Sequence, residues 1–156
     1  MRKVIVFNNV SLDGVMQAPG RPDEDERNGF DRGGWAQEYN DDVKGAAMGA
    51  GMASGAELLF GRRTYEDFHY AWHGQTGNPF SEVLDNTPKY VASTTAEEPL
   101  IWENSTLLTG DVIEAVEELK QQDGPDLLIM GSNKLIQSLR AKPGVIDEYH
   151  LMIHPL

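Results

Sequence analysis

Short apolar runs alternate with stretches of helical periodicity along the chain. Runs rich in β-branched residues and bounded by Gly, Pro, Asn or Asp are typical of strands. They predict strands over residues 4–10, 57–60, 90–93, 105–108, 126–130 and 148–154. Apolar positions spaced three and four residues apart predict helices over residues 35–56, 64–72, 80–85, 112–123 and 134–140. Strands separated by helices favour right-handed crossovers, so we expect one α/β domain over residues 1–156, with three αβα layers and a mainly parallel central sheet.

Two segments depart from this regular alternation. The expected helix 35–56 contains Gly45, Gly49, Gly51 and Gly55, each of which costs about 1 kcal/mol relative to Ala. Glycines there make sense if another backbone packs closely against that helix face. Residues 17–34 carry two Pro, four Gly and many charges, which predicts a long loop. Loops of this length in compact domains are often binding loops or lids.

The charge of the chain narrows the possible partners. Its formal net charge is −12, which argues against a nucleic-acid backbone because that binding depends on Lys and Arg. Much of the acid lies within residues 21–32 and at Asp41 and Asp42, which is typical of a solvated loop. No window approaches the roughly 18 apolar residues of a membrane span. The apolar run 4–7 is too short for a signal peptide, so we expect a cytoplasmic protein without membrane partners.

A pair of arginines follows the second expected strand. Gly61 ends that strand, and Arg62, Arg63 and Thr64 open the next helix. The first N–H groups of a helix have no partner within it and favour an anion, and guanidinium groups bind phosphate oxygens in pairs. The pair can therefore be a phosphate site, or simply two solvated side chains.

Two further turns on the same sheet edge suit phosphate. Gly131, Ser132, Asn133 and Lys134 lie between a buried strand and a helix, and hydroxyl residues 93–95 end the third strand. Either turn alone also fits helix packing or capping. In a parallel sheet, however, all three turns lie beyond the carboxyl ends of the strands, where ligands bind. Together they suit a dinucleotide that carries an additional phosphate.

Competing sites are poorly supported by the sequence. Residues 49–54 approach G-x-G-x-x-G but precede a strand instead of following one, and the chain has no Walker loop. His69 and His73 lack a third metal ligand, so we expect no metal site. There is no cysteine, nucleophilic serine motif or paired catalytic carboxylate. Hydride transfer needs little from side chains when a cofactor supplies the chemistry.

Several segments jointly resemble the dihydrofolate reductase-like family, and within it the riboflavin-biosynthesis reductase type. These segments are residues 4–16, 33–35, 61–65, 89–94 and 126–132. The resemblance implies an NADPH-dependent oxidoreductase that passes hydride to a small pterin-like or aminouracil-like ring. The sequence leaves open a non-catalytic nucleotide-binding module of the same fold, or a simple interaction domain.

The resemblance also implies roles for individual residues. Gly14 and the loop after it would cover the nicotinamide, and Asn9, Asp13 and Trp35 would line the substrate side, with Asp13 and Trp35 as candidate catalytic residues. The remaining implied cofactor-binding residues are Gly61, Arg62, Arg63, Thr64, Ser93, Thr94, Gly131, Ser132, Asn133 and Lys134. The family that this chain resembles usually continues past residue 155 into further antiparallel strands. We therefore expect this chain to lack the last strands, either because it is a fragment or because a partner supplies the missing sheet edge, and we expect it to pair as a homodimer.

Overall fold

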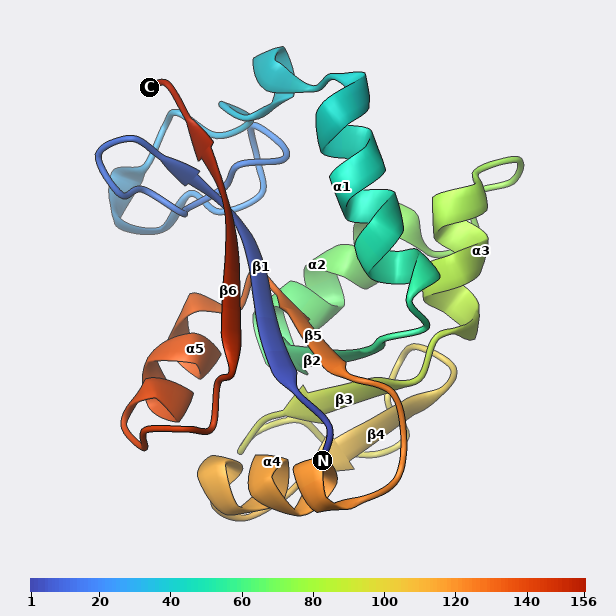
Figure 1. Ribbon diagram of the computed structural model, residues 1–156. Coiled ribbons are helices and arrows are strands. Elements are labelled where there is room, and N and C mark those ends of the chain that lie inside the picture. Colours follow the sequence, from blue (N-terminus) through green and yellow to red (C-terminus); the bar gives the residue numbers. More distant parts are fainter.

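Six parallel strands form one sheet in the computed structural model, which describes residues 1–156 (Figure 1). Their order across the sheet is β4-β3-β2-β5-β1-β6. The strands are β1 Val4–Ser11, β2 Glu57–Gly61, β3 Lys89–Ala92, β4 Ser105–Leu108, β5 Leu127–Met130 and β6 Glu148–His154. Every pairing is parallel, so the expectation of a mainly parallel sheet is confirmed.

Helices cover both faces of the sheet, which confirms the three-layer arrangement. On one face lie α1 Asp42–Ala53, α2 Arg62–Trp72 and α3 Pro79–Asn86, and on the other lie α4 Val112–Gln121 and α5 Asn133–Arg140. Figure 1 shows α1 and α5 on opposite sides of β1. The core is divided accordingly into two apolar clusters, one on each face of the sheet.

Side chains alternate between these two clusters along the strands. In β2, Leu58 and Phe60 pack toward α2 and α3, whereas Leu59 packs toward α4 and α5. All four residues of β5 are buried, as a continuous apolar run predicts for a strand covered on both faces. Helix α4 begins where expected, because the Asp111 carboxylate accepts the backbone N–H groups of Ile113 at 2.9 Å and Glu114 at 3.0 Å.

The helix expected over residues 35–56 is shorter than the sequence pattern indicated. Residues Gln37–Tyr39 form a 3-10 turn, and α1 begins only at Asp42, where the Asp41 side chain accepts the N–H of Lys44. No residue of α1 is buried. A Cβ added at Gly45 or Gly49 would meet no neighbour within 4 Å. A Cβ at Gly55 would likewise meet nothing, and one at Gly51 would meet only the Leu128 side chain, at 4.0 Å. The expectation of another backbone packed closely against this helix face is therefore wrong at all four glycines.

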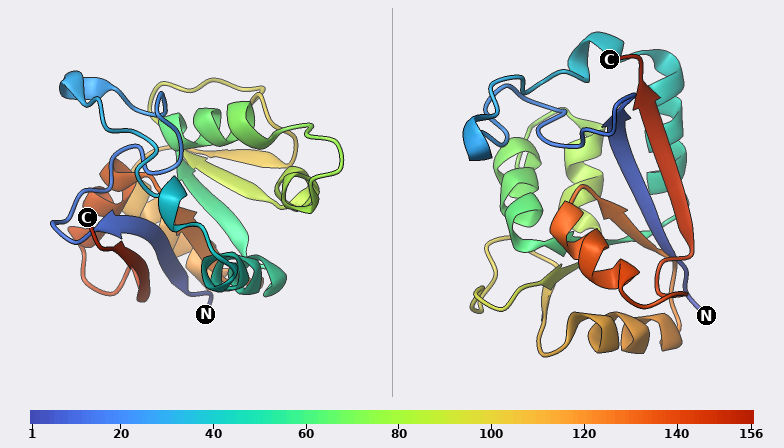
Figure 2. Two further views of the ribbon diagram at one scale, coloured as in Figure 1. Left: turned by 90° about the horizontal axis from the view of Figure 1, so that it is seen from above. Right: turned by 90° about the vertical axis from the view of Figure 1, so that its left-hand side faces the viewer.

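Strand β6 forms one edge of the sheet and pairs only with β1. Its side chains Tyr149, Leu151 and Ile153 are exposed although they are apolar. The chain ends beside the loop that follows β1, as the two views in Figure 2 show. None of the helices is long and apolar enough to cross a membrane.

Candidate functional site

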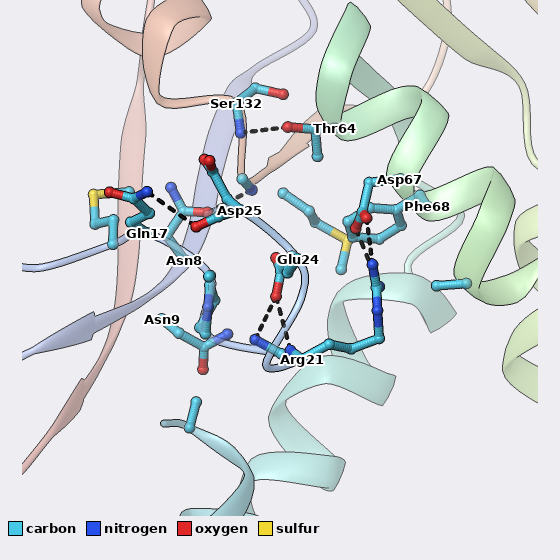
Figure 3. Close-up of a pocket in the computed structure, with 18 of the residues that line it drawn as sticks. Asn8, Asn9, Gln17, Arg21, Glu24, Asp25, Thr64, Asp67, Phe68 and Ser132 are labelled. Atoms are coloured by element: carbon cyan, nitrogen blue, oxygen red, sulfur yellow. Dashed lines mark hydrogen bonds and ion pairs between the residues drawn. The ribbon is translucent and has the colours of Figure 1, made fainter. Parts of the chain in front are cut away.

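A large cavity opens at the carboxyl ends of β1 and β5 (Figure 3). Its volume is about 1350 Å³, and its walls come from these strand ends, the loop 16–27 and helices α1 and α2. Pockets for one small molecule usually measure about 300–1,000 Å³. The cavity therefore has room for a cofactor and a second ligand.

The turns after β2 and β5 are joined by two hydrogen bonds at the wall of this cavity. The Ser132 backbone N–H donates to Thr64 Oγ1 at 3.0 Å, and the Gly61 N–H donates to Ser132 Oγ at 2.9 Å. Gly131 has a φ of +74°, and a Cβ there would lie 3.0 Å from Thr64 Cγ2. A glycine is required at this position by both backbone conformation and space. The two phosphate-suited turns expected from the sequence thus lie in direct contact.

Asn8 connects β1 to the same turn. Its Oδ1 accepts the Gly131 N–H at 2.6 Å, which leaves its Nδ2 as the remaining donor. The side chain is 4% exposed, and Nδ2 has no hydrogen-bond partner in the protein. An unpaired buried donor costs about 1–3 kcal/mol, so such groups call for an explanation. A ligand oxygen beside Gly131 would supply the missing acceptor.

The two adjacent arginines have different surroundings. Arg62 Nε donates to Glu66 Oε1 at 2.8 Å and its Nη1 donates to Thr95 Oγ1 at 2.8 Å. Arg63 lines the cavity beside Thr64 and has no hydrogen bond or ion pair within the protein. Of the pair, only Arg63 both lines the cavity and has a guanidinium group without a partner in the protein.

The structure brings together only some of the implied site residues. Those lining the cavity are Asn9, Arg63, Thr64, Gly131, Ser132 and Asn133. Those outside its lining are Asp13, Gly14, Trp35, Gly61, Arg62, Ser93, Thr94 and Lys134. Ser93 Oγ accepts the N–H groups of Thr95 at 3.1 Å and Ala96 at 2.9 Å, which is the capping alternative for that turn.

Asn9 and Trp35 meet through a third residue, His154. The His154 ring lies 2.9 Å from Asn9 Oδ1 and packs edge-on against Trp35, with ring centroids 5.4 Å apart. Burial, with the nearby Lys44 ammonium, lowers the pKa of His154 below its ordinary value. Asp13 is exposed and accepts a hydrogen bond from Ser11 Oγ, so it takes no part in this cluster.

The loop after β1 contributes side chains that sequence reasoning missed. Glu24 and Asp25 are only partly exposed and line the cavity, so the expectation of a fully solvated acidic loop is wrong for them. The loop is held to α2 by Arg21, whose guanidinium bonds both carboxylate oxygens of Asp67, at 2.5 and 3.3 Å. This contact joins residues far apart in sequence, so local pattern gives no sign of it. The length of the loop was the only available signal.

The two loop carboxylates differ in electrostatic environment. Burial raises the pKa of Glu24, although the N–H groups of Gly20 and Arg21 oppose that effect. Asp25 is bound by the Arg27 guanidinium, which lowers its pKa. The cavity therefore holds one well-neutralised carboxylate and one that burial disfavours in its charged form.

Comparisons with known proteins match nearly the whole chain to one domain family. A family model described as the RibD C-terminal domain matches residues 2–156. The uncharacterized protein YyaP of Bacillus subtilis (strain 168) is 28% identical over 104 residues, which are 64% of this chain and 53% of YyaP. The match thus spans about half of that relative.

A crystal structure from Shewanella sp. PV-4, provisionally described as a riboflavin biosynthesis protein, has a similar fold. It superposes with a TM-score of 0.60 at 22% sequence identity, covering 99% of this chain and 77% of that one. At this identity the likeness bears on the fold alone.

Proposed function

Since the chain belongs to the RibD C-terminal domain family, we propose that it is an NADPH-dependent reductase of a small pterin-like or aminouracil-like ring. The observation that carries this proposal is the pair of joined turns, with Arg63 and Gly131 at the end of β1. The volume of the cavity, about 1350 Å³, suits a dinucleotide and a small ring together.

The phosphate end of the proposed cofactor site has two parts. Arg63 offers an unpaired guanidinium for a 2′-phosphate, because a planar fork binds phosphate oxygens bidentately. The start of α5, at Asn133, adds N–H groups and the positive end of a helix dipole for the diphosphate. Asn8 Nδ2 fits as a donor to a further cofactor oxygen, since it is buried without an acceptor.

At the reacting end, this chain's residues would bind and enclose the ring. NADPH supplies the hydride when it is bound. The loop 16–27 lines the cavity and would limit the access of water to a bound ring. Gln17 fixes the loop by donating to the carbonyls of Asp25 and Arg27, both at 3.0 Å. Asn9, oriented by His154, offers an amide on the same side.

Titration with NADPH and with NADH tests the proposal. Trp72 lines the cavity, so the tryptophan fluorescence of the protein, to which Trp35 and Trp102 also contribute, should change on binding. We expect NADPH to bind more tightly than NADH, and a panel of aminouracils and dihydropterins to include at least one compound that oxidises it. Failure of both nucleotides to bind would refute the proposal. Binding without turnover of any compound would instead support the non-catalytic module.

We also propose that the protein pairs as a homodimer through β6. The exposed apolar side chains Tyr149, Leu151 and Ile153 lie on an edge strand, where unpaired backbone groups favour association. Sedimentation equilibrium should give twice the monomer mass. Ile153→Lys should shift the protein toward the monomer, whereas a wild-type monomer would refute this part of the proposal.

A further inference from the structure

Glu24 occupies an unusual position in the cavity wall. Its Oε2 accepts two backbone N–H groups, from Gly20 at 2.6 Å and from Arg21 at 3.0 Å. Its other oxygen, Oε1, accepts no hydrogen bond from the protein. In Figure 3 one oxygen faces the turn at Arg21 while the other points away from it. Half of the carboxylate is fixed and half is free.

The carboxylate also has no ion-pair partner. The nearest cation along the chain, Arg21, is engaged by Asp67 on α2. Burial is the largest influence on the Glu24 pKa and raises it, and the negative charge of Asp67 acts in the same direction. A partly buried carboxylate with an unused oxygen carries a desolvation cost, and groups with a perturbed pKa gather at functional sites.

From this geometry we propose that Glu24 binds the N–H edge of the ring that enters the cavity, and so selects heterocycles that carry amino or ring N–H donors. This inference rests on the proposed function, because it names the residue that would recognise the substrate of the same site. Fixed by two N–H groups on Oε2, the carboxylate presents Oε1 without freedom to rotate away. The step is recognition only, and no bond is made or broken.

The neighbouring walls suit a flat ring. Phe68 and Trp72 from α2 and Met48 from α1 line the cavity on the side of that helix pair. Aromatic and thioether side chains pack well against a heterocycle and leave its polar edge to a few placed groups. Glu24 is such a group, and an acceptor at this point would favour rings bearing donors over rings bearing only acceptors.

Glu24→Gln is the sharpest variant for a test. The Gln carbonyl oxygen can still accept the N–H groups of Gly20 and Arg21, but an NH₂ donor replaces the free oxygen. A donor facing a donor cannot bond, so we expect diaminopyrimidine to bind at least about tenfold more weakly, as loss of a charge-assisted hydrogen bond implies. Dimethoxypyrimidine has the same ring without amino N–H groups, and its weaker binding should change by less than about twofold.

Two controls separate recognition from folding. Asp23→Asn removes a carboxylate from the same loop. The Asp23 side chain is 69% exposed outside the cavity lining, and its contact with Arg21, at 3.5 Å, is a surface ion pair of little strength, so all affinities should stay within about twofold of the wild type. The thermal midpoint of Glu24→Gln should equal or exceed that of the wild type, because a charge disfavoured by burial is removed. Glu24→Asp retains the charge but retracts it, and should lose part of the diaminopyrimidine affinity.

The outcomes are distinct. Loss of diaminopyrimidine binding in Glu24→Gln, with NADPH affinity within about twofold of the wild type, supports the inference. Equal diaminopyrimidine affinity in the two proteins, or none in the wild type, overturns it. If diaminopyrimidine binds through Glu24 but NADPH does not bind the wild type, the proposed reductase function is refuted, whereas the inference that Glu24 binds a heterocycle still holds.

Discussion

Arg63 is the residue whose removal should distinguish the two nicotinamide cofactors most strongly. Its side chain lines the cavity and makes no hydrogen bond or ion pair within the protein. Arg63→Ala therefore breaks no hydrogen bond or ion pair within the protein, although it also removes a positive charge that helps to lower the pKa of Asp25. A hydrogen bond to a charged group contributes about 1.5–3 kcal/mol, so NADPH affinity should fall about 10- to 150-fold.

The adjacent arginine is a matched control for this variant. Arg62 is the neighbour of Arg63 at the start of α2, but its guanidinium group already donates to Glu66 and Thr95. The Arg62–Glu66 pair is exposed, and such pairs contribute about 0–1 kcal/mol, so Arg62→Ala should change stability little. It should also change NADPH affinity by less than about threefold.

The assay is a titration of each variant with NADPH and NADH at about 0.15 M salt, followed by the tryptophan fluorescence of the protein, with Trp72 as the reporter in the cavity wall. NADH lacks the 2′-phosphate, so Arg63→Ala should lower the affinity for NADH by less than about threefold. Equal losses of affinity for both nucleotides would show that Arg63 does not bind the 2′-phosphate. A larger effect of Arg62→Ala would refute the reasoning from free and occupied guanidinium groups.

Three other predictions concern the scaffold around the site. Gly131→Ala should weaken NADPH binding and lower thermal stability, because the new side chain combines a left-handed φ with a contact to Thr64 Cγ2. Adding Thr64→Ser should restore part of the affinity and part of the stability. Absence of this rescue would show that the steric contact is not the cause. Arg2→Ala leaves the Glu57 carboxylate without its partner in a buried ion pair, and it should lower the free energy of unfolding in urea by about 3–5 kcal/mol. A loss below about 1 kcal/mol would contradict this. Burial lowers the pKa of Lys89 to about 8, so between that pH and its ordinary pKa of 10.5 the unfolded chain binds more protons and the free energy of unfolding should rise with pH. Lys89→Met should remove that rise, and an unchanged pH slope in the variant would argue against it.

The fold was largely accessible from the sequence because its strongest signals are local. The buried run at β5 and the Asp111 cap of α4 each specify their element within a few residues. Strand and helix alternation then determines a parallel sheet by handedness and chain connectivity. The boundary of α1 was placed too early, because aromatic and alanine spacing over residues 35–41 mimics a helix that Asp41 actually begins.

The candidate site was only partly accessible for a related reason. The joined turns at Thr64 and Ser132 follow from strand ends that must meet on one edge of the sheet. Glu24 could not be found in this way, because its burial depends on the Arg21–Asp67 contact across 46 positions. Composition alone makes an acidic loop look solvated, and only tertiary structure shows which of its carboxylates face the cavity.

A crystal structure of the full chain with NADPH tests the central claim most directly. The account predicts the 2′-phosphate within hydrogen-bond distance of the Arg63 guanidinium and the diphosphate at the turn from Gly131 to Asn133. Asn8 Nδ2 should then have an oxygen of the ligand as its acceptor. A nucleotide bound elsewhere, or bound here with its phosphates away from both turns, would contradict the account.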